Sequence, residues 1–279
     1  MINDNKKFMN IFNMDKQYLT NAIEKYTCIS HLLFSTNISA LADDIREWAM
    51  GCIVNNNLIL SGSKAKGTAI SLSSDYDVFV PLVVGTVIGE NNDTTLEDLY
   101  NNLYNFFKEK QYNVKKQNVS IKVILSNGIS QLKVDVTPGR KEDSPYNYNN
   151  YWLYCNRGEK NRVKTNIKVH IDKVKESKRI NEIKLLKILR SLYNIDFPSI
   201  YLECLLIYKI LKYKNTGDDY LVNNLWHILE ELSRDVNNPL FERLEDPAKT
   251  NNILSNLLSD PEKEAIIKKM QKIKQKTIY

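Results

Sequence analysis

Three aspartates and one glycine–serine pair are the residues of this chain whose types and spacing point most directly to chemistry. Gly62-Ser63 follows the short apolar run 58–61, and Asp75 and Asp77 lie two positions apart at the start of another run. Residues two apart on a strand point to the same face, so both carboxylates are expected on one side of that strand. They repel each other unless a cation lies between them, and Mg²⁺ prefers carboxylate oxygens together with substrate phosphates.

A third carboxylate, Asp135, interrupts the apolar segment 132–138. A buried Asp is costly without a partner, so it is a candidate for the same site. Three such carboxylates suit a two-metal centre for phosphoryl or nucleotidyl transfer, with Mg²⁺ or Mn²⁺ as the ions. Gly62 allows the backbone to approach a ligand closely, and exposed N–H groups with the Ser63 hydroxyl can hold phosphate oxygens. Each motif is common by itself in surface turns, and the ordered set is far more specific.

The elements that must position these residues are mixed in the first half of the chain and helical in the second. Hydrophobic periodicity predicts helices at 37–54 and 95–109 and strands at 58–61, 76–84, 119–125 and 131–136, the last two joined by a turn at Asn127-Gly128. From about residue 165 the period is helical, with helices predicted at 180–193, 200–213, 220–232 and 262–276. We therefore predict a mixed domain over 1–155 and a helical domain over 156–279.

Composition narrows the class of protein. The chain has 279 residues, 43% hydrophobic and 26% charged, which is typical of a globular protein. Its four Cys are far apart and form no C-x-x-C pair, which argues against a disulfide scaffold or a zinc ribbon and favours a reducing cytoplasm. The polar segment 1–6 does not resemble a signal peptide, and no apolar run approaches the ~20 residues of a membrane helix.

The net charge of +6 is concentrated in the second half. Residues 157–190 hold 12 basic and four acidic residues, a net charge of +8. Such a local excess favours a polyanionic partner, either nucleoside triphosphates or a nucleic acid. The alternative interpretation is a solvated helix face rich in Lys.

The ordered motifs resemble those of the DNA polymerase β-like nucleotidyltransferases. The segments Lys164-Thr165-Asn166, 185–190 and 198–203 look like the helical half of one branch. That branch contains the oligoadenylate synthetases, cyclic GMP–AMP synthase and the bacterial cyclic-oligonucleotide synthases (CD-NTases) of anti-phage defence. The resemblance extends from about residue 40 to 258.

This resemblance implies an α+β, bilobal fold, with a mixed sheet and flanking helices followed by a helical domain that closes the active-site cleft. It also implies a cytoplasmic monomer that joins NTPs into a cyclic di- or oligonucleotide and releases pyrophosphate. The implied roles concern the metal and the nucleotide. Two Mg²⁺ or Mn²⁺ ions would be held by Asp75, Asp77 and Asp135; phosphates would be held by Gly62, Ser63, Lys187 and Ser199; and a base edge would be read by Asn166.

Several alternatives stay open at this level. The motifs also suit a nucleotidyltransferase that modifies a tRNA 3′ end or a small molecule, or an inactive module that binds RNA. Lys187 can equally be a solvated Lys, and Asn166 a helix cap. The basic segment 157–190 is hypothesised to be a helix that binds a structured RNA activator through Lys173, Lys175, Lys178 and Arg179.

Overall fold

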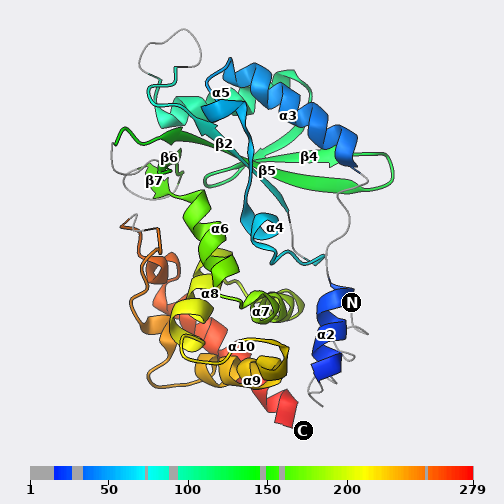
Figure 1. The fold of residues 1–279 in the computed structure, drawn as a ribbon, viewed down its shortest axis with the longest axis vertical. Coiled ribbons are helices and arrows are strands. Elements are labelled where there is room, and N and C mark those ends of the chain that lie inside the picture. Colours follow the sequence, from blue (N-terminus) through cyan, green and yellow to red (C-terminus); the bar gives the residue numbers. More distant parts are fainter. Residues whose placement is uncertain are drawn as a thin grey trace. The chain divides into compact units, whose positions relative to one another are not determined.

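The structure is a computed structural model that describes residues 16–26, 34–72, 75–87, 94–144, 149–156, 161–248 and 251–278 (Figure 1). The chain forms two compact units. The sheet unit comprises Ile29–Lys66 and Ser74–Ile171, and the helical unit comprises Met1–Cys28, Gly67–Ser73 and Asp172–Tyr279. The short segment Gly67–Ser73 therefore belongs to the helical unit, although the chain on both sides of it belongs to the sheet unit.

The sheet unit is built on one mixed sheet, in the strand order β1-β2-β5-β4-β3, with β6 paired to β5 and β7 to β6. The pair β2–β5 is parallel, and every other pair in the described sheet is antiparallel. The strand bounds are β1 Ile59–Leu60, β2 Tyr76–Leu82, β3 Asn113–Lys116, β4 Ile121–Ser126, β5 Gln131–Lys141, β6 Tyr151–Tyr154 and β7 Arg162–Thr165.

Two long helices cover one face of this sheet. These are α3 (Ser35–Ala49) and α5 (Leu96–Glu109), and the short elements η3 (Val54–Asn56) and α4 (Gly62–Lys66) flank β1. The core beneath the long helices takes alternate residues of the central strands, among them Val78 and Val80 of β2 and Val134 and Val136 of β5. Because side chains alternate across a strand, the intervening residues of β2 and β5 point to the opposite face. That face carries the charged residues described below.

The predicted helices and central strands of this unit are confirmed, with shifted ends. Helix α5 begins where the sequence predicts, because Thr95 and Asp98 form a capping box. Helix α3 ends at Ala49, before the predicted end at 54, because Met50 and Gly51 both have positive φ values. The one-turn helix α4 and the strands β3, β6 and β7 were not predicted from the sequence.

The helical unit has a continuous apolar core of its own. Its elements are α2 Lys16–Lys25, α7 Ile180–Leu192, α8 Ser199–Leu205, the π-helix η4 Leu206–Ile210, η5 Asp218–Tyr220, α9 Leu221–Leu232, η6 Pro239–Phe241, η7 Leu254–Leu257 and α10 Asp260–Ile278. Helix α6 (Ile167–Glu176) runs from the sheet unit into this one. The predicted helix 200–213 is thus a short α-helix followed by a π-helix. None of the helices in the described part of the chain is long and apolar enough to span a membrane.

The boundary between the units differs from the predicted one at 155/156. It falls after Ile171, because β6 pairs with β5 and β7 pairs with β6, so sheet hydrogen bonding continues to Thr165. The helical unit is also not one continuous stretch of the chain, because it includes α2 and the segment Gly67–Ser73. The prediction concerning the amino-terminal residues 1–6 lies outside the described residues.

Candidate active site

The parallel strand pair β2–β5 brings two of the predicted carboxylates together. Asp77 of β2 lies directly opposite Asp135 of β5 in the strand register. Asp75 immediately precedes β2, on the same side as Asp77 by the alternation of the strand. On the other edge of β5, Lys122 of β4 is the register partner of Asp135. The sheet therefore places three carboxylates and one ammonium on neighbouring positions of one face.

The ammonium of Lys122 lies between two of these carboxylates. Its Nζ is 2.6 Å from Asp75 Oδ2 and 3.6 Å from Asp135 Oδ1. Gln117 adds a neutral partner: in the orientation that satisfies its neighbours, its amide nitrogen lies 3.2 Å from both Asp135 oxygens and its oxygen accepts from Lys122. These side chains are half-buried, so their mutual charges are only partly screened by water.

The electrostatics of the cluster show that one positive charge does not balance it. Burial raises the pKa of Asp135 to about 6; Lys122 opposes that shift, and the charges of Asp75 and Asp77 add to it. Burial acts to lower the pKa of Lys122, but the hydrogen bond to Asp75 and the charge of Asp135 outweigh it and raise that pKa overall. A further cation would relieve the excess negative charge.

This donor set fits a divalent cation. Carboxylate oxygens are the ligands that Mg²⁺ prefers, and the charges of Asp75 and Asp77 add to the burial that raises the pKa of Asp135. In the conformation described, Lys122 balances part of that negative charge. No group of three or more His, Cys, Asp or Glu side chains in the described ranges is gathered as a metal site.

The glycine–serine pair lies against this cluster. Strand β1 pairs with β2, the Ser61 N–H donates to the carbonyl of Asp77 at 2.9 Å, and the chain then turns at Gly62 into α4. Gly62 has a φ of 62°, and a Cβ at this position would lie 1.9 Å from Asp77 Oδ2. Only glycine allows so close an approach of backbone to carboxylate, and Ser63 follows in the first turn of α4.

We expect Gly62→Ala to be more destabilising than Gly128→Ala. Both glycines have positive φ values, 62° and 84°, so alanine costs about 1 kcal/mol of backbone strain at either position. At Gly128 no atom lies within 4 Å of the place that an alanine methyl group would take, whereas at Gly62 the methyl group displaces the Asp77 carboxylate. The clash should add roughly 1–3 kcal/mol. Urea unfolding of both variants measures the difference, and equal losses would contradict the close approach.

We expect Asp135 to make the metal-free protein less stable as pH rises. The folded pKa of about 6 lies above the ~3.9 of an unfolded Asp, so the folded state binds this proton more tightly. The resulting contribution to stability is fully present below pH 4 and is lost as pH rises through about 6. Two pKa units correspond to roughly 3 kcal/mol.

Asp135→Asn should therefore stabilise the protein at pH 7.5 and leave its stability at pH 4 nearly unchanged. Urea unfolding in the presence of a chelator, at both pH values, measures this. The matched control is Asp143→Asn, an exposed Asp of the same unit, which should have the stability of the wild type at each of the two pH values. A wild-type pH profile in Asp135→Asn would overturn the electrostatic description of the cluster.

Lys187 and Ser199, the two predicted phosphate contacts of the second half, belong to the helical unit. The ammonium of Lys187 is buried there: its Nζ is 2.6 Å from Glu203 Oε1 and 2.8 Å from the Thr68 hydroxyl. Lys187, Glu203 and Thr68 are 3%, 1% and 0% exposed. The interpretation of Lys187 as a solvated Lys is thus wrong, and a phosphate contact would require its ammonium to leave Glu203.

Ser199 begins α8 and is exposed. Its hydroxyl accepts a hydrogen bond from Arg190 Nη1 at 2.8 Å, and the same nitrogen donates to the carbonyl of Phe197. Burial is the main cause that lowers the pKa of Arg190. A half-buried guanidinium beside the Ser199 hydroxyl is a feature that the sequence analysis did not single out.

Asn166 is the cap of helix α6. Its Oδ1 accepts from the Val169 N–H at 3.1 Å, and its Nδ2 donates to Asn150 Oδ1 at 3.0 Å. This is the alternative that the sequence left open for Asn166. Both ends of the amide are engaged within the sheet unit.

The predicted basic helix 157–190 is not one helix. Residues 161–190 contain β7, α6 and the start of α7, and 157–160 lie outside the described residues. Arg179 is only 4% exposed and bonds to Glu182, so the prediction that it contacts RNA is wrong. A buried guanidinium needs internal partners and cannot face a solvated polyanion. Lys173, Lys175 and Lys178 are exposed.

Comparison with known proteins supplies a family and a fold. The sequence profile described as "Second Messenger Oligonucleotide or Dinucleotide Synthetase domain" matches residues 16–178, more than half of the chain. No curated protein matches the chain in sequence.

Several solved structures are similar in fold. The Escherichia coli MS115-1 CdnC in its complex with HORMA-deltaN is 21% identical, with 91% of this chain and 88% of that chain covered and a TM-score of 0.65. The Elizabethkingia meningoseptica CdnE cyclic dinucleotide synthase with GTP and Apcpp is 17% identical, covers 95% and 100%, and has a TM-score of 0.64. The STING-associated CdnE c-di-GMP synthase from Capnocytophaga granulosa is 17% identical, covers 100% and 92%, and has a TM-score of 0.66. These similarities confirm the predicted fold class, a mixed sheet with flanking helices and a helical part.

Proposed function

We propose that this chain, which belongs to the Second Messenger Oligonucleotide or Dinucleotide Synthetase family of nucleotidyltransferases, is a cyclic-nucleotide synthase. It would join NTPs into a cyclic di- or oligonucleotide and release pyrophosphate. The chain is a bacterial CD-NTase by family. The observation that carries the proposal is the facing pair Asp77 and Asp135 on parallel strands, with Asp75 beside them and Gly62 against Asp77.

The proposed cofactor is a pair of Mg²⁺ or Mn²⁺ ions held by Asp75, Asp77 and Asp135. Such ions activate an attacking hydroxyl and neutralise the charge that develops on the transferred phosphoryl group. Asp135 would help to hold one of the ions and would orient the attacking ribose hydroxyl. Lys122 remains an ammonium beside it because the hydrogen bond to Asp75 and the charges of Asp135 and Asp75 raise the pKa of Lys122.

The donor triphosphate would be held by Gly62 and Ser63, whose backbone N–H groups and hydroxyl follow the tight turn after β1. From the helical unit we propose Ser199 as a phosphate contact, assisted by the guanidinium of Arg190 that already binds its hydroxyl. For Lys187 we propose a positioning role in place of direct contact. Its ion pair with Glu203 and its bond to Thr68 hold the segment between the Gly62-Ser63 turn and Asp75.

Known relatives agree with NTP substrates. The E. meningoseptica structure is described with GTP and Apcpp, and a Bradyrhizobium diazoefficiens CdnG structure with GTP. For this chain we propose NTP substrates in the cytoplasm and a role in anti-phage signalling. Plaque counts on cells that express the gene with its natural neighbours, compared with an Asp75→Asn strain, test that role.

The central experiment is an incubation of the purified chain with labelled NTPs and Mg²⁺ or Mn²⁺, followed by nuclease and phosphatase treatment. A phosphatase-resistant product with release of pyrophosphate supports cyclisation. Label transferred to added tRNA or to an aminoglycoside would replace the proposal with transfer to another acceptor. No pyrophosphate under any condition would favour an inactive, RNA-binding module.

The same assay tests two finer proposals. One is an RNA activator bound by Lys173, Lys175 and Lys178, which predicts more product with structured RNA at low salt and loss of that gain at raised salt. Equal activity with and without RNA would indicate that these lysines form only a solvated surface and bind no activator. The other is base selection by Asn166, which requires its amide to exchange partners. Competition among the four NTPs with Asn166→Ser tests it, and unchanged preference would leave Asn166 a cap only.

A further inference from the structure

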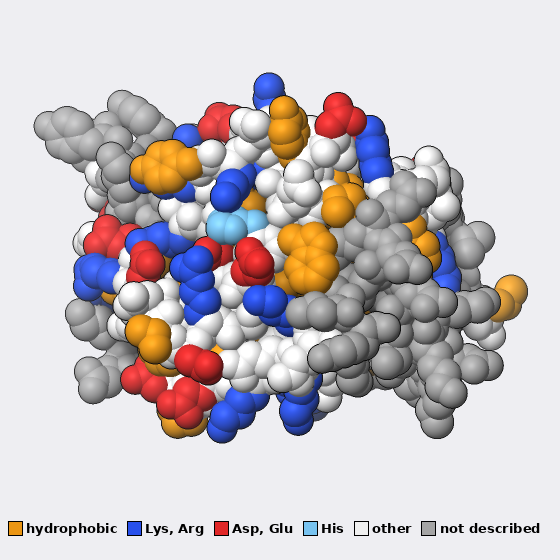
Figure 2. Space-filling model, turned by 90° about the horizontal axis from the view of Figure 1, so that it is seen from below, with side chains coloured by type: hydrophobic (Ala, Val, Ile, Leu, Met, Phe, Trp, Pro, Cys, Tyr) orange, Lys and Arg blue, Asp and Glu red, His pale blue; other side chains and the backbone are white. Residues whose placement is uncertain are grey.

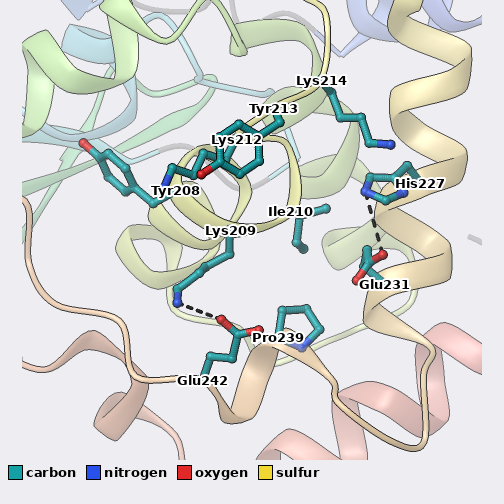
Figure 3. Close-up of a pocket in the computed structure, with 10 residues that line it drawn as sticks. All are labelled: Tyr208, Lys209, Ile210, Lys212, Tyr213, Lys214, His227, Glu231, Pro239 and Glu242. Atoms are coloured by element: carbon teal, nitrogen blue, oxygen red, sulfur yellow. Dashed lines mark hydrogen bonds and ion pairs between the residues drawn. The ribbon is translucent and has the colours of Figure 1, made fainter.

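A pocket in the helical unit lies outside everything assigned above. Its volume is about 510 Å³, within the range of small-molecule sites. The wall is formed by the end of the π-helix η4 and the turn after it, by α9 and by η6 (Figure 3). We propose that this pocket binds a phosphorylated small molecule of the nucleoside phosphate class, apart from the NTPs of the proposed reaction.

The charges of the pocket favour an anion. Lys209 is paired with Glu242 at 2.7 Å, and Glu231 is paired with Arg234 at 2.5 Å. Lys212 and Lys214 also line the pocket, are exposed, and have no ion pair with any described residue. Two ammonium groups are thus left for a ligand, and a phosphate is the anion that binds several donors at once.

One side of the pocket offers two kinds of donor. Lys214 and His227 lie on the same side in Figure 3, and His227 Nε2 is 3.8 Å from Glu231 Oε1. An imidazole in this place donates to a phosphate oxygen from a ring N–H, while Lys214 supplies charge. A phosphate held here is therefore bound by both a point charge and a directed donor.

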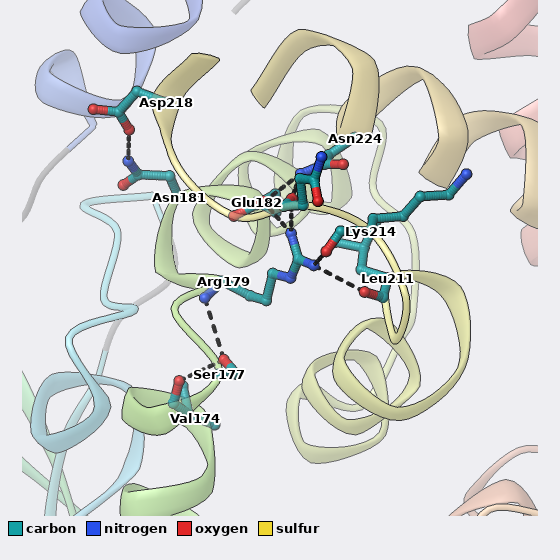
Figure 4. Close-up of polar contacts among 10 residues, drawn as sticks. Val174, Ser177, Arg179, Asn181, Glu182, Leu211, Lys214, Asp218 and Asn224 are labelled. Atoms are coloured by element: carbon teal, nitrogen blue, oxygen red, sulfur yellow. Dashed lines mark hydrogen bonds and ion pairs between the residues drawn. The ribbon is translucent and has the colours of Figure 1, made fainter. Parts of the chain in front are cut away.

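The turn that carries Lys212, Tyr213 and Lys214 is held from inside by Arg179 (Figure 4). The Arg179 guanidinium donates to the carbonyl of Asn215 at 2.7 Å, to that of Leu211 at 2.9 Å, and also to that of Lys214. Glu182 neutralises it at 3.1 Å, so the buried charge has its partner.

Asn224 completes this support. Its amide donates to Glu182 at 2.9 Å and to the carbonyl of Asn215 at 3.0 Å. The backbone on both sides of the three exposed side chains is consequently fixed before any ligand arrives. Preorganisation of this kind lowers the entropy that binding costs, and it is what a binding turn needs. A π-helix directly before the turn is in keeping with this, since π-helical turns occur frequently at functional sites.

The exposed ring of Tyr213 favours a ligand that contains an aromatic group. Its side chain lines the pocket and is 87% exposed, and Lys212 Nζ lies 4.9 Å from the ring centroid. An aromatic ring on a fixed turn beside phosphate donors suits a base that stacks, as aromatic side chains do with nucleobases. The pocket volume also exceeds what a phosphate alone would fill.

The same surroundings disfavour a long nucleic acid. Glu231 and Glu242 line the pocket with the lysines, and a phosphate backbone passing over them would be repelled. Figure 2 shows a face on which Lys and Arg side chains are interspersed with Asp and Glu, without a continuous basic track. A small ligand needs only the part of the pocket beside Lys212 and Lys214. Glu231 and Glu242 are paired with Arg234 and Lys209.

The test is calorimetric titration of the full-length protein with AMP, GMP, CMP and UMP and with inorganic phosphate, in EDTA to suppress metal-assisted binding at the aspartate cluster. Wild type should bind at least one nucleoside monophosphate, and Lys212→Glu/Lys214→Glu should weaken it about tenfold or more. The matched control is Lys268→Glu/Lys272→Glu, two exposed lysines of α10 that do not line the pocket; it should bind as wild type. Tyr213→Leu should weaken the nucleotide and leave phosphate binding unchanged.

Asp75→Asn separates this proposal from the proposed function. Nucleotide binding that persists in Asp75→Asn and fails in Lys212→Glu/Lys214→Glu supports the pocket even if no cyclic product is ever found. Binding lost only in Asp75→Asn would overturn the proposal, as would equal weakening by the α10 control. A short RNA duplex that binds more tightly than any mononucleotide and depends on Lys212 and Lys214 would also overturn it, in favour of a polyanion surface. If Tyr213→Leu weakened the binding of neither the nucleoside monophosphates nor inorganic phosphate, the assignment of the ligand to the nucleoside phosphates would be overturned.

Discussion

Replacing Asp75 and Asp77 with Asn should abolish product formation while the protein stays folded. The two amides keep the shape of the carboxylates but remove two of the three negative charges that would hold the metal ions. Loss of metal-assisted phosphoryl transfer is expected to cost on the order of 10³-fold or more in rate. Pyrophosphate release from labelled NTPs measures the effect, and circular dichroism checks the fold.

The control for that experiment is Asp143→Asn, which removes one exposed carboxylate from the same unit. It should retain wild-type turnover at every Mg²⁺ concentration. The single variants Asp75→Asn and Asp77→Asn should each lose most activity and shift the Mg²⁺ requirement upward if any rate remains. Wild-type turnover in the double variant would sink the assignment of this cluster as the catalytic centre.

Replacing Lys187 with Met should lower the free energy of unfolding by about 3–5 kcal/mol, because it leaves a buried carboxylate without its cation. Glu203 is 1% exposed, and its Oε1 accepts from both Lys187 and Thr68. Glu203→Gln should also destabilise the protein, because the amide oxygen can still accept from Lys187 but no longer balances its buried charge. The double variant Lys187→Met/Glu203→Leu removes both charges and should recover most of the loss.

Urea unfolding measures these changes. The control is Lys16→Met, which breaks an exposed pair with Asp219 of similar length, 2.6 Å, in the same unit. No measurable change is expected there, because water solvates both groups after the break. If Lys187→Met were as mild as Lys16→Met, the ammonium would be solvated in solution, and direct phosphate contact by Lys187 would become the better account.

The sequence alone singles out the three carboxylates, because strand alternation and apolar neighbours are local signals. It misses Lys122, because its position depends on strand register. A two-residue turn at Asn127-Gly128 would pair Lys122 with Lys133. The observed loop spans four residues, Asn127 to Ser130, in which Asn127 Oδ1 accepts from two backbone N–H groups, and this places Lys122 opposite Asp135.

The buried polar contacts inside the helical unit also could not be predicted from the sequence. A Lys or Arg on a helix is predicted to be solvated unless its partner is known. The hydrogen-bond partners of Lys187 and Arg179 include residues far away in the sequence. Thr68, which bonds to Lys187, lies in a loop with no periodic pattern. Long-range pairing of polar groups leaves no periodic trace, whereas apolar faces do.

Because Gly67–Ser73 belongs to the helical unit, some of its contacts can form only late in the synthesis of the chain. Thr68 is synthesised early, but its partners Lys187 and Glu203 follow 119 and 135 positions later. Contacts of such long sequence separation slow folding. On the ribosome, the Thr68 hydroxyl therefore lacks these two partners until α7 and then α8 have been translated. A chain truncated before α8 should retain its sheet and yet lack the bond between Thr68 and Glu203.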